Sequence, residues 1–265
     1  MTEAMRESFY SVAGCPCKIA LASDLHEKPW GAVLASLKDN RPALICVPGD
    51  FLFGKLPKDD LKIRKAGVLP FFSACCEIAP CFVSLGNHEW LLTDEDAALL
   101  RDTGVVLLDN AYTTAEIAGR RLVIGGLTSA RVSEYRRALD AGLPVLEANE
   151  QTRPVGVKKH VPPELTWLDG FCAEPGYHIL LCHHPEYYPR WLRERPIELI
   201  LSGHAHGGQV RILGQGLYAP GQGVLPKLTG GVKEERLVIS RGLANCQRVP
   251  RLFNPPELVY VLPEK

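Results

Sequence analysis

The sequence predicts an α/β fold in which short buried strands alternate with helices, so that a parallel sheet is covered on both faces. The first observation is a series of apolar runs about five residues long, such as Lys18–Ala22, Ala43–Val47 and Cys81–Leu85, which suits buried strands better than helices. The second is that stretches of helical character separate these runs. The third is composition: 265 residues, 46% hydrophobic and 23% charged, are typical of a globular protein with a sizeable core.

The first half of the chain supplies these elements in alternation. A helix is predicted at Gly31–Leu37, after the first strand. A helical stretch over Leu61–Ile78 follows the second strand, with Pro70 as a candidate break. After the third strand, Thr93 is placed to cap a helix at Asp94–Arg101.

The alternation weakens in the second half. Val105–Leu108 is expected to form a fourth strand, and Ala111–Ala118 and Arg121–Gly126 are expected to pair as a hairpin. Ser129–Pro163 is polar and has no clear period, so it is either an insertion over an active site or a long loop that contains a helix. The remaining predicted elements are a helix at Pro163–Cys172, strands at His178–Cys182 and Glu198–Leu201, and two late antiparallel strands at Arg236–Ser240 and Leu258–Leu262.

No internal repeat or linker divides the sequence, so a single domain over residues 1–265 is expected, with 129–163 as a candidate insertion near the active site. Lys plus Arg equals Asp plus Glu, at 30 each. This balance disfavours a broad basic surface for nucleic acid, whereas a small phosphorylated substrate in a local site is compatible with it.

The N-terminal segment Met1–Tyr10 is polar, and no apolar run reaches the ~18 residues of a membrane span. A cytoplasmic location is therefore expected. Contact with a membrane surface stays open but has no transmembrane segment to support it, and the oligomeric state is also open.

Polar side chains with metal-ligand chemistry follow five of the predicted strands. Each set lies just beyond the carboxyl end of its strand, the edge at which α/β sheets bind ligands. The sets are Asp24 and His26; Asp50; Asn87, His88 and Glu89; His183 and His184; and His204 and His206. The five sets are therefore expected to converge on one crevice.

The chemical types of these side chains indicate the cofactor. Carboxylates, an amide carbonyl and several imidazoles suit Mn, Fe or Zn better than Ca, with Mg or Ni as alternatives. Seven such ligands are too many for one tetrahedral ion but enough for two divalent ions that share a bridging carboxylate. Two ions about 3.5–4 Å apart can hold a hydroxide between them and clamp a phosphoryl group. Glycines before Asp50, Asn87 and His204 fit tight turns into the crevice.

This pattern resembles the calcineurin-like metallophosphoesterase superfamily, whose motifs are D-x-H, G-D, G-N-H-[DE], H and G-H-x-H. Here they stand as Asp24-Leu25-His26, Gly49-Asp50, Gly86-Asn87-His88-Glu89, His183 and Gly203-His204-Ala205-His206. The resemblance runs from residue 18 to 209. It implies a four-layer α/β/β/α sandwich with two mixed sheets.

The resemblance also implies roles for the residues. One metal would be held by Asp24, His26, Asp50 and His206, and the other by Asp50, Asn87, His183 and His204, so that Asp50 bridges. His88 would contact the phosphate and protonate the leaving oxygen without binding metal. The family pattern H-x-P selects His183, rather than His184, as the ligand. Glu89 would close its turn or orient a neighbour.

Two departures narrow the subclass. Protein serine/threonine phosphatases continue G-D-x-x-D-R-G, where this chain has Phe53 and Gly54 in place of the Asp that partners the catalytic histidine and the Arg that grips phosphate. Purple acid phosphatases place a tyrosine ligand where Phe53 stands. Neither branch is expected.

The end of the chain is similar to a bacterial phosphodiesterase subgroup with many membrane-associated members. The similar features are Gly203–Gln209, Ser240-Arg241-Gly242-Leu243, Arg251-Leu252-Phe253 and Pro256-Glu257. The resemblance implies a metal-dependent phosphodiesterase. The alternatives are a nucleotide-lipid pyrophosphatase or a phosphomonoesterase of the same fold and, outside enzymes, a catalytically silent scaffold.

Overall fold

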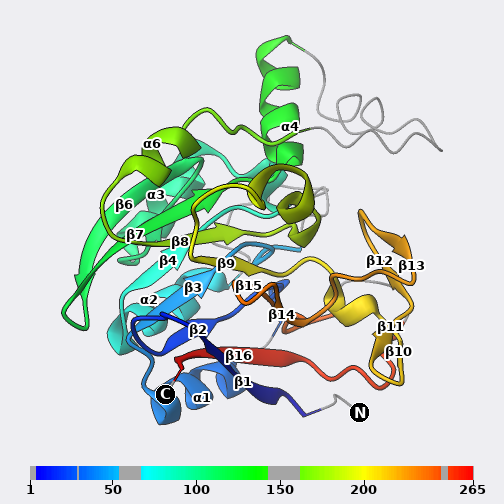
Figure 1. The fold of residues 1–265 in the computed structure, drawn as a ribbon. Coiled ribbons are helices and arrows are strands. Elements are labelled where there is room, and N and C mark those ends of the chain that lie inside the picture. The colour runs from blue at the N-terminus through cyan, green and yellow to red at the C-terminus, as the bar shows by residue number, and fades with distance from the viewer. Residues whose placement is uncertain (1–3, 29, 54–66, 143–161, 246–249, 265) are drawn as a thin grey trace.

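Two six-stranded mixed sheets form the centre of the protein, seen in a computed structural model that describes residues 4–28, 30–53, 67–142, 162–245 and 250–264 (Figure 1). The first sheet has the order β1 (Arg6–Val12), β16 (Glu257–Pro263), β2 (Ile19–Leu21), β3 (Leu44–Val47), β4 (Cys81–Val83) and β5 (Val106–Leu107). The second has the order β14 (Gly231–Lys233), β15 (Leu237–Ile239), β9 (Leu199–Ser202), β8 (Tyr177–Cys182), β7 (Arg120–Leu127) and β6 (Ala111–Ile117).

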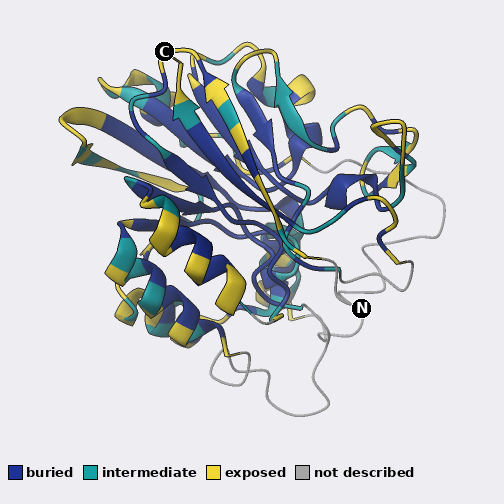
Figure 2. Ribbon diagram, turned by 90° about the horizontal axis from the view of Figure 1, so that it is seen from below, coloured by how far each residue is buried: buried dark blue, intermediate teal, exposed yellow. Residues whose placement is uncertain are grey.

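The two sheets pack face to face through apolar side chains. Every residue of the short strands β2, β3 and β4 is buried, because one face meets the other sheet and the opposite face meets helices. In Figure 2 the central strands are accordingly dark blue and exposed residues appear in strands at the edges, while the helices below the sheets turn exposed residues outward. The predicted four-layer α/β/β/α sandwich is confirmed.

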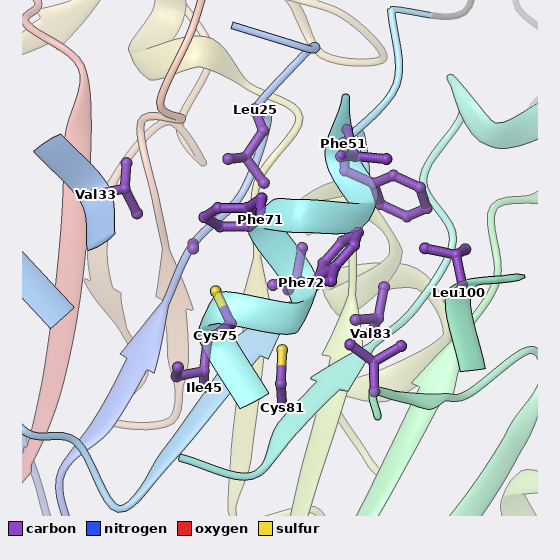
Figure 3. Close-up of a cluster of buried hydrophobic side chains, with 14 of the residues drawn as sticks. Leu25, Val33, Ile45, Phe51, Phe71, Phe72, Cys75, Cys81, Val83 and Leu100 are labelled. Atoms are coloured by element: carbon purple, nitrogen blue, oxygen red, sulfur yellow. The ribbon is translucent and has the colours of Figure 1, made fainter. Parts of the chain in front are cut away.

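The helices form the outer layers. α1 (Gly31–Asn40), α2 (Val68–Ile78) and α3 (Asp94–Asp102) flank the first sheet, and α6 (Leu168–Ala173) covers the second, while α4 (Ala130–Asp140) rises beside them. Phe71 and Phe72 of α2 lie under the loop after β3, and the ring of Phe72 meets Phe51 edge-on at 5.3 Å (Figure 3). Phe51 is fully buried, and burial of such a ring contributes about 1.5–3 kcal/mol, so the core anchors the loop that carries Asp50.

Most predicted elements are present, with boundary shifts. Pro70 does not break α2 because it occupies the helix's first turn, where a missing N–H costs nothing. Residues 61–66 of that predicted stretch, and 143–161 of the candidate insertion, lie outside the described residues. The predicted helix at Pro163–Cys172 begins only at Leu168.

The late strands are antiparallel to one neighbour each, as predicted, and parallel to the other. β16 is antiparallel to β2 and parallel to β1. β15 is antiparallel to β14 and parallel to β9, because the long connection from β9 returns to the same end of the sheet. Strand β1 was not predicted from the polar N-terminus. It lies at the edge of the first sheet, where four of its seven residues are exposed.

Candidate metal centre

The predicted ligands come from loops of both sheets. Asp24, His26, Asp50, Asn87 and His88 follow β2, β3 and β4 of the first sheet, and His183, His204 and His206 follow β8 and β9 of the second. Strands β2, β3 and β4 are parallel to one another, as are β8 and β9, so within each sheet these loops leave at a common edge. The structure brings the side chains together in two adjoining groups.

The first group consists of Asp24, His26 and His206, whose ligand atoms all lie within 4.8 Å of one another. The Nε2 atoms of the two imidazoles are 3.4 Å apart, and Asp24 Oδ1 is 3.3 Å from His206 Nε2. A contact between the Nδ1 atom and a backbone carbonyl oxygen sets the orientation of each ring. His26 Nδ1 lies 3.0 Å from Leu52 O, and His206 Nδ1 lies 3.2 Å from Ala244 O. Such carbonyl contacts fix the tautomer in which Nε2 carries the lone pair that can bind a metal.

The second group consists of Asp50, His183 and His204. His183 Nε2 lies 3.0 Å from Asp50 Oδ2 and 3.9 Å from Asp24 Oδ1, so the two groups adjoin. His183 Nδ1 and the Oδ1 atom of Asn87 are buried without a hydrogen-bond partner, while His183 Nε2 faces the Asp50 carboxylate. Buried polar atoms are rarely left unpaired, and an imidazole nitrogen and an amide oxygen are both metal-ligand atoms.

The backbone is strained where the predicted ligands stand. Asp24, His26, Asp50, His204 and His206 all have positive φ, between 44° and 64°. Non-glycine residues seldom adopt this conformation, which costs on the order of 1–3 kcal/mol at each position and clusters at functional sites.

Two of the predicted glycines are required by close approach. A Cβ atom at Gly203 would collide with Ser23 Oγ and Asp24 Oδ2, and one at Gly86 would collide with Asp50 Oδ1. The absence of a side chain thus lets a loop of the second sheet approach the first sheet at Gly203, and lets two loops of the first sheet approach each other at Gly86.

Glu89 holds two of the loops together. Its fully buried carboxylate accepts hydrogen bonds from the backbone N–H groups of Asp50 (2.8 Å), Leu52 (3.0 Å) and Gly86 (2.8 Å). Burial, followed by the charge of Asp50, raises the pKa of Glu89 to about 7. Glu89 thus fixes the position of Asp50 relative to the loop that carries Asn87 and His88.

His88 is partly exposed, with a side-chain exposure of 21%, whereas Asp50 and His183 are buried. Its Nδ1 atom lies 2.6 Å from the backbone oxygen of Phe53, and its Nε2 lies 3.8 Å from Asp50 Oδ2. The carbonyl of Phe53 therefore orients the ring in place of the carboxylate that protein phosphatases use. The ring is also close enough to His26 and Asp50 to form a third potential metal-binding group.

The charges in the second group reinforce one another. Burial alone would lower the pKa of His183, but the Asp50 and Asp24 carboxylates outweigh it and raise the pKa to about 9. Burial alone would raise the pKa of Asp50, yet His183 and His88 hold it well below its usual range. A divalent cation would take over the positive charge that His183 supplies to these carboxylates.

His184 is engaged by protein groups on both sides. Its Nε2 lies 2.8 Å from Ser129 Oγ, and its Nδ1 lies 3.2 Å from Glu186 Oε1. Glu186 also lies 3.7 Å from His204 Nε2, which makes these three residues a further group of metal-ligand types. Sequence reasoning passed over Glu186, although its position two residues beyond a histidine motif was visible.

The residues present fit a divalent metal centre. The structure places a carboxylate and two imidazoles in each main group, and an unpartnered amide oxygen at Asn87. Oxygen and nitrogen donors in this mixture suit Mn, Fe or Zn.

Comparisons with known proteins agree with this chemistry. A family model described as calcineurin-like phosphoesterase matches residues 17–208. The chain is 25% identical over 244 residues to an uncharacterised protein, YpbG, of Bacillus subtilis, which covers 91% of this chain and 79% of that protein. It is 23% identical over 217 residues to phosphodiesterase YaeI of Escherichia coli, in an alignment that covers 78% of this chain and 67% of that protein. A solved 5'-nucleotidase precursor from Thermus thermophilus aligns with a TM-score of 0.45 at 14% identity, over 74% of this chain and 43% of the other.

Proposed function

We propose, since the chain belongs to the calcineurin-like phosphoesterase family, that it hydrolyses phosphodiesters with the help of two divalent metal ions. The observation that carries the proposal is the pair of adjoining ligand groups, one around Asp24 and one around Asp50. Each group alone would suit one ion, and the 3.9 Å contact between Asp24 Oδ1 and His183 Nε2 brings the groups into one centre.

The ligands would be divided as the family pattern suggests. Asp24, His26, Asp50 and His206 would hold one ion, and Asp50, Asn87, His183 and His204 would hold the other. The central position of Asp50 supports its role as the shared ligand, because its carboxylate falls in a group with His26 and in a group with His183.

When bound, the ions would supply an activated water nucleophile and positive charge for the phosphoryl oxygens. The chain's own residues would do the rest. His88, oriented by Phe53 O, would donate a proton from Nε2 to the leaving oxygen, a role for which imidazole as a chemical group is suited. Glu89 would fix the position of His88 relative to Asp50 through its hydrogen bonds with three backbone N–H groups.

A diester is preferred over a phosphoprotein as substrate. The sequence has Gly54 where protein phosphatases carry their phosphate-gripping arginine, and a relative is named a phosphodiesterase. Gly54 itself lies outside the described residues.

The test is hydrolysis of bis(p-nitrophenyl) phosphate by purified protein supplied with Mn, Fe, Zn or Mg. We expect turnover with at least one metal, and a loss of about 10²–10⁴-fold in His88→Ala. Elemental analysis should find normal metal content in that variant and reduced content in Asp50→Asn. His178→Asn, which changes a histidine paired with Glu198 away from the centre, is the matched control.

Three results would count against the proposal. Inactivity on every phosphoester with every metal would favour a silent scaffold. Faster turnover of p-nitrophenyl phosphate than of the diester would favour a monoesterase. Loss of metal from His88→Ala would make His88 a ligand rather than the acid.

A further inference from the structure

The exposed large apolar side chains are concentrated in one small part of the molecule. Within the described ranges, seven of the ten such side chains belong to residues 210–225 and 252–253. These residues, called here the hairpin lobe, include the hairpins β10 (Arg211–Ile212) with β11 (Gln215–Gly216) and β12 (Tyr218–Ala219) with β13 (Gly223–Val224). The seven are Ile212, Leu213, Tyr218, Val224, Leu225, Leu252 and Phe253.

The hairpin lobe is an ordered unit beside the sandwich, where Figure 1 shows β10 to β13 standing apart from the two sheets. Backbone hydrogen bonds join its parts: Arg211 N–H donates to Leu252 O at 3.0 Å, and Leu225 N–H donates to Leu217 O at 2.9 Å. Its apolar side chains are therefore held outward by a fixed backbone.

Three of these large apolar side chains are exposed at positions with a left-handed backbone conformation, which is unfavourable for their residue types. Leu213, Leu225 and Phe253 have φ of 50°, 50° and 54°, and they are 102%, 60% and 81% exposed. Asparagine or glycine fits a left-handed turn position with less strain, and a polar residue suits exposure. Since neither the turn nor the core requires these large apolar groups, they point to a partner outside the chain.

The charge of the region identifies that partner. Residues 199–233 contain no Asp or Glu, although acidic residues make up 30 of 265 in the chain, and they include Arg211, Lys227 and Lys233. Lys227 is exposed, whereas Arg251 is buried and donates to backbone oxygens. Apolar tips on a lobe that has no acidic residue of its own and lies next to Lys227 in the sequence match the headgroup region of an anionic bilayer, which takes up apolar groups and attracts nearby lysines and arginines.

We propose that the hairpin lobe docks the protein on anionic phospholipid bilayers, with Leu213, Leu225 and Phe253 inserted among the headgroups. The apolar run Phe51-Leu52-Phe53 beside Asp50 does not form such a patch, because Phe51 and Leu52 are buried. The described residues include no helix long and apolar enough to cross a bilayer, so the contact proposed is one with the surface.

Docking would also orient the candidate site. A cavity of about 490 Å³ is lined by Leu225 and Lys227 of this region and by Glu186, whose Oε1 lies 3.7 Å from His204 Nε2. The bilayer would thus face a cavity that borders the metal ligands, and this consequence, unlike docking itself, rests on the proposed function.

The experiment is flotation of the full chain with two kinds of vesicle, phosphatidylcholine alone and phosphatidylcholine with about a third phosphatidylglycerol. We expect the protein to float with the anionic vesicles and not with the neutral ones. The combined variant Leu213→Asn, Leu225→Asn, Phe253→Asn should lose at least about tenfold of that binding. Its melting temperature should equal or exceed that of the parent protein, because asparagine suits these turns.

The matched control is Ala118→Asn, at the exposed left-handed tip of the β6–β7 hairpin, which should bind as the parent does. The single variant Leu213→Asn repeats the test if the combined variant fails to fold. Hydrolysis of bis(p-nitrophenyl) phosphate in solution should be unchanged in Leu213→Asn, Phe253→Asn and Ala118→Asn, none of which changes a residue that lines the cavity, and this separates docking from catalysis.

The proposal is overturned if the parent protein does not float with anionic vesicles, binds neutral vesicles equally, or if the combined variant binds as well as the parent. It is also overturned if light scattering finds a parent dimer that the combined variant converts to a monomer, because the lobe would then bind a second copy.

Discussion

At the scale of single residues, Glu89 connects the chemistry of the site to its backbone. Replacement of Glu89 by Gln keeps the size of the side chain but removes one of the two acceptor oxygens that three buried N–H groups share. We expect a loss of about 1–3 kcal/mol in the free energy of unfolding, because a buried donor is left unpaired. Urea denaturation of the metal-free protein measures the loss directly.

The change should also weaken metal binding, since the backbone positions of Asp50 and Gly86 relax together. Glu116→Gln, on the exposed face of β6, is the control and should change neither property. Unchanged stability and metal content in Glu89→Gln would show that the three contacts do not position the loops.

His183 makes metal binding dependent on pH. With its pKa raised to about 9, its ring is protonated at neutral pH in the metal-free protein, whereas a metal requires the neutral ring. Binding at pH 7 should therefore release about one proton from this residue, and the affinity should rise with pH until about 9. Titration calorimetry in two buffers of different ionisation enthalpy measures the release, and identical heats in both buffers would refute it.

The sequence motifs predicted which side chains lie close together, but they did not predict which groups orient those side chains. The proximity of Asp24, His26 and His206 follows from strand ends and motif order. The backbone oxygens of Leu52, Phe53 and Ala244, which turn three of the histidine rings, could not be predicted, because every residue has such an oxygen. Only the folded geometry decides which ones are used.

At the scale of elements, the start of α3 at Asp94 and its capping residue Thr93 are both as the sequence predicted. Thr93 accepts a hydrogen bond from Asp96 N–H at 3.2 Å, and the Asp96 side chain accepts one from Thr93 N–H, which completes a capping box. Thr93→Ala should destabilise the protein by about 1 kcal/mol, because the Asp96 N–H loses its acceptor, Thr93 Oγ1. Thermal melting gives the change, and Thr93→Ser, which keeps the hydroxyl, should restore most of it. Equal melting of the alanine variant and the parent would contradict the role of the cap.

The elements that were missed share a physical cause. Apolar runs predicted β2, β3 and β4 because these strands are buried on both faces. β1 is an edge strand with polar, exposed residues, and β10 to β13 are two-residue strands held by turns. Neither kind has the apolar periodicity on which such predictions depend.

At the scale of the whole molecule, the strand–helix alternation suggested one sheet covered by helices, and only the family resemblance implied two. Local pattern does not show whether the second face of a buried strand meets a helix or another sheet, since both require apolar side chains. The difference matters for the site. Each ligand group joins the two sheets: His206 of the second sheet's loops meets Asp24, and His183 meets Asp50 of the first.

Because the two candidate metal sites each span both sheets, bound metal should stabilise the entire sandwich. At a metal concentration about 100-fold above the dissociation constant, binding of one ion adds about 2.7 kcal/mol to the free energy of unfolding. In a protein of this size that corresponds to a rise in melting temperature of about 5–10 °C. Calorimetry of the metal-free protein, with and without added Mn, measures the shift, and a chelator should reverse it.

Asp50→Asn should lose most of the shift because it removes the carboxylate shared by both groups, while Asp39→Asn, exposed on α1, should keep it. A shift that is equal in both variants would mean that the stabilising metal binds elsewhere, and that the two sheets are held together by their apolar faces alone.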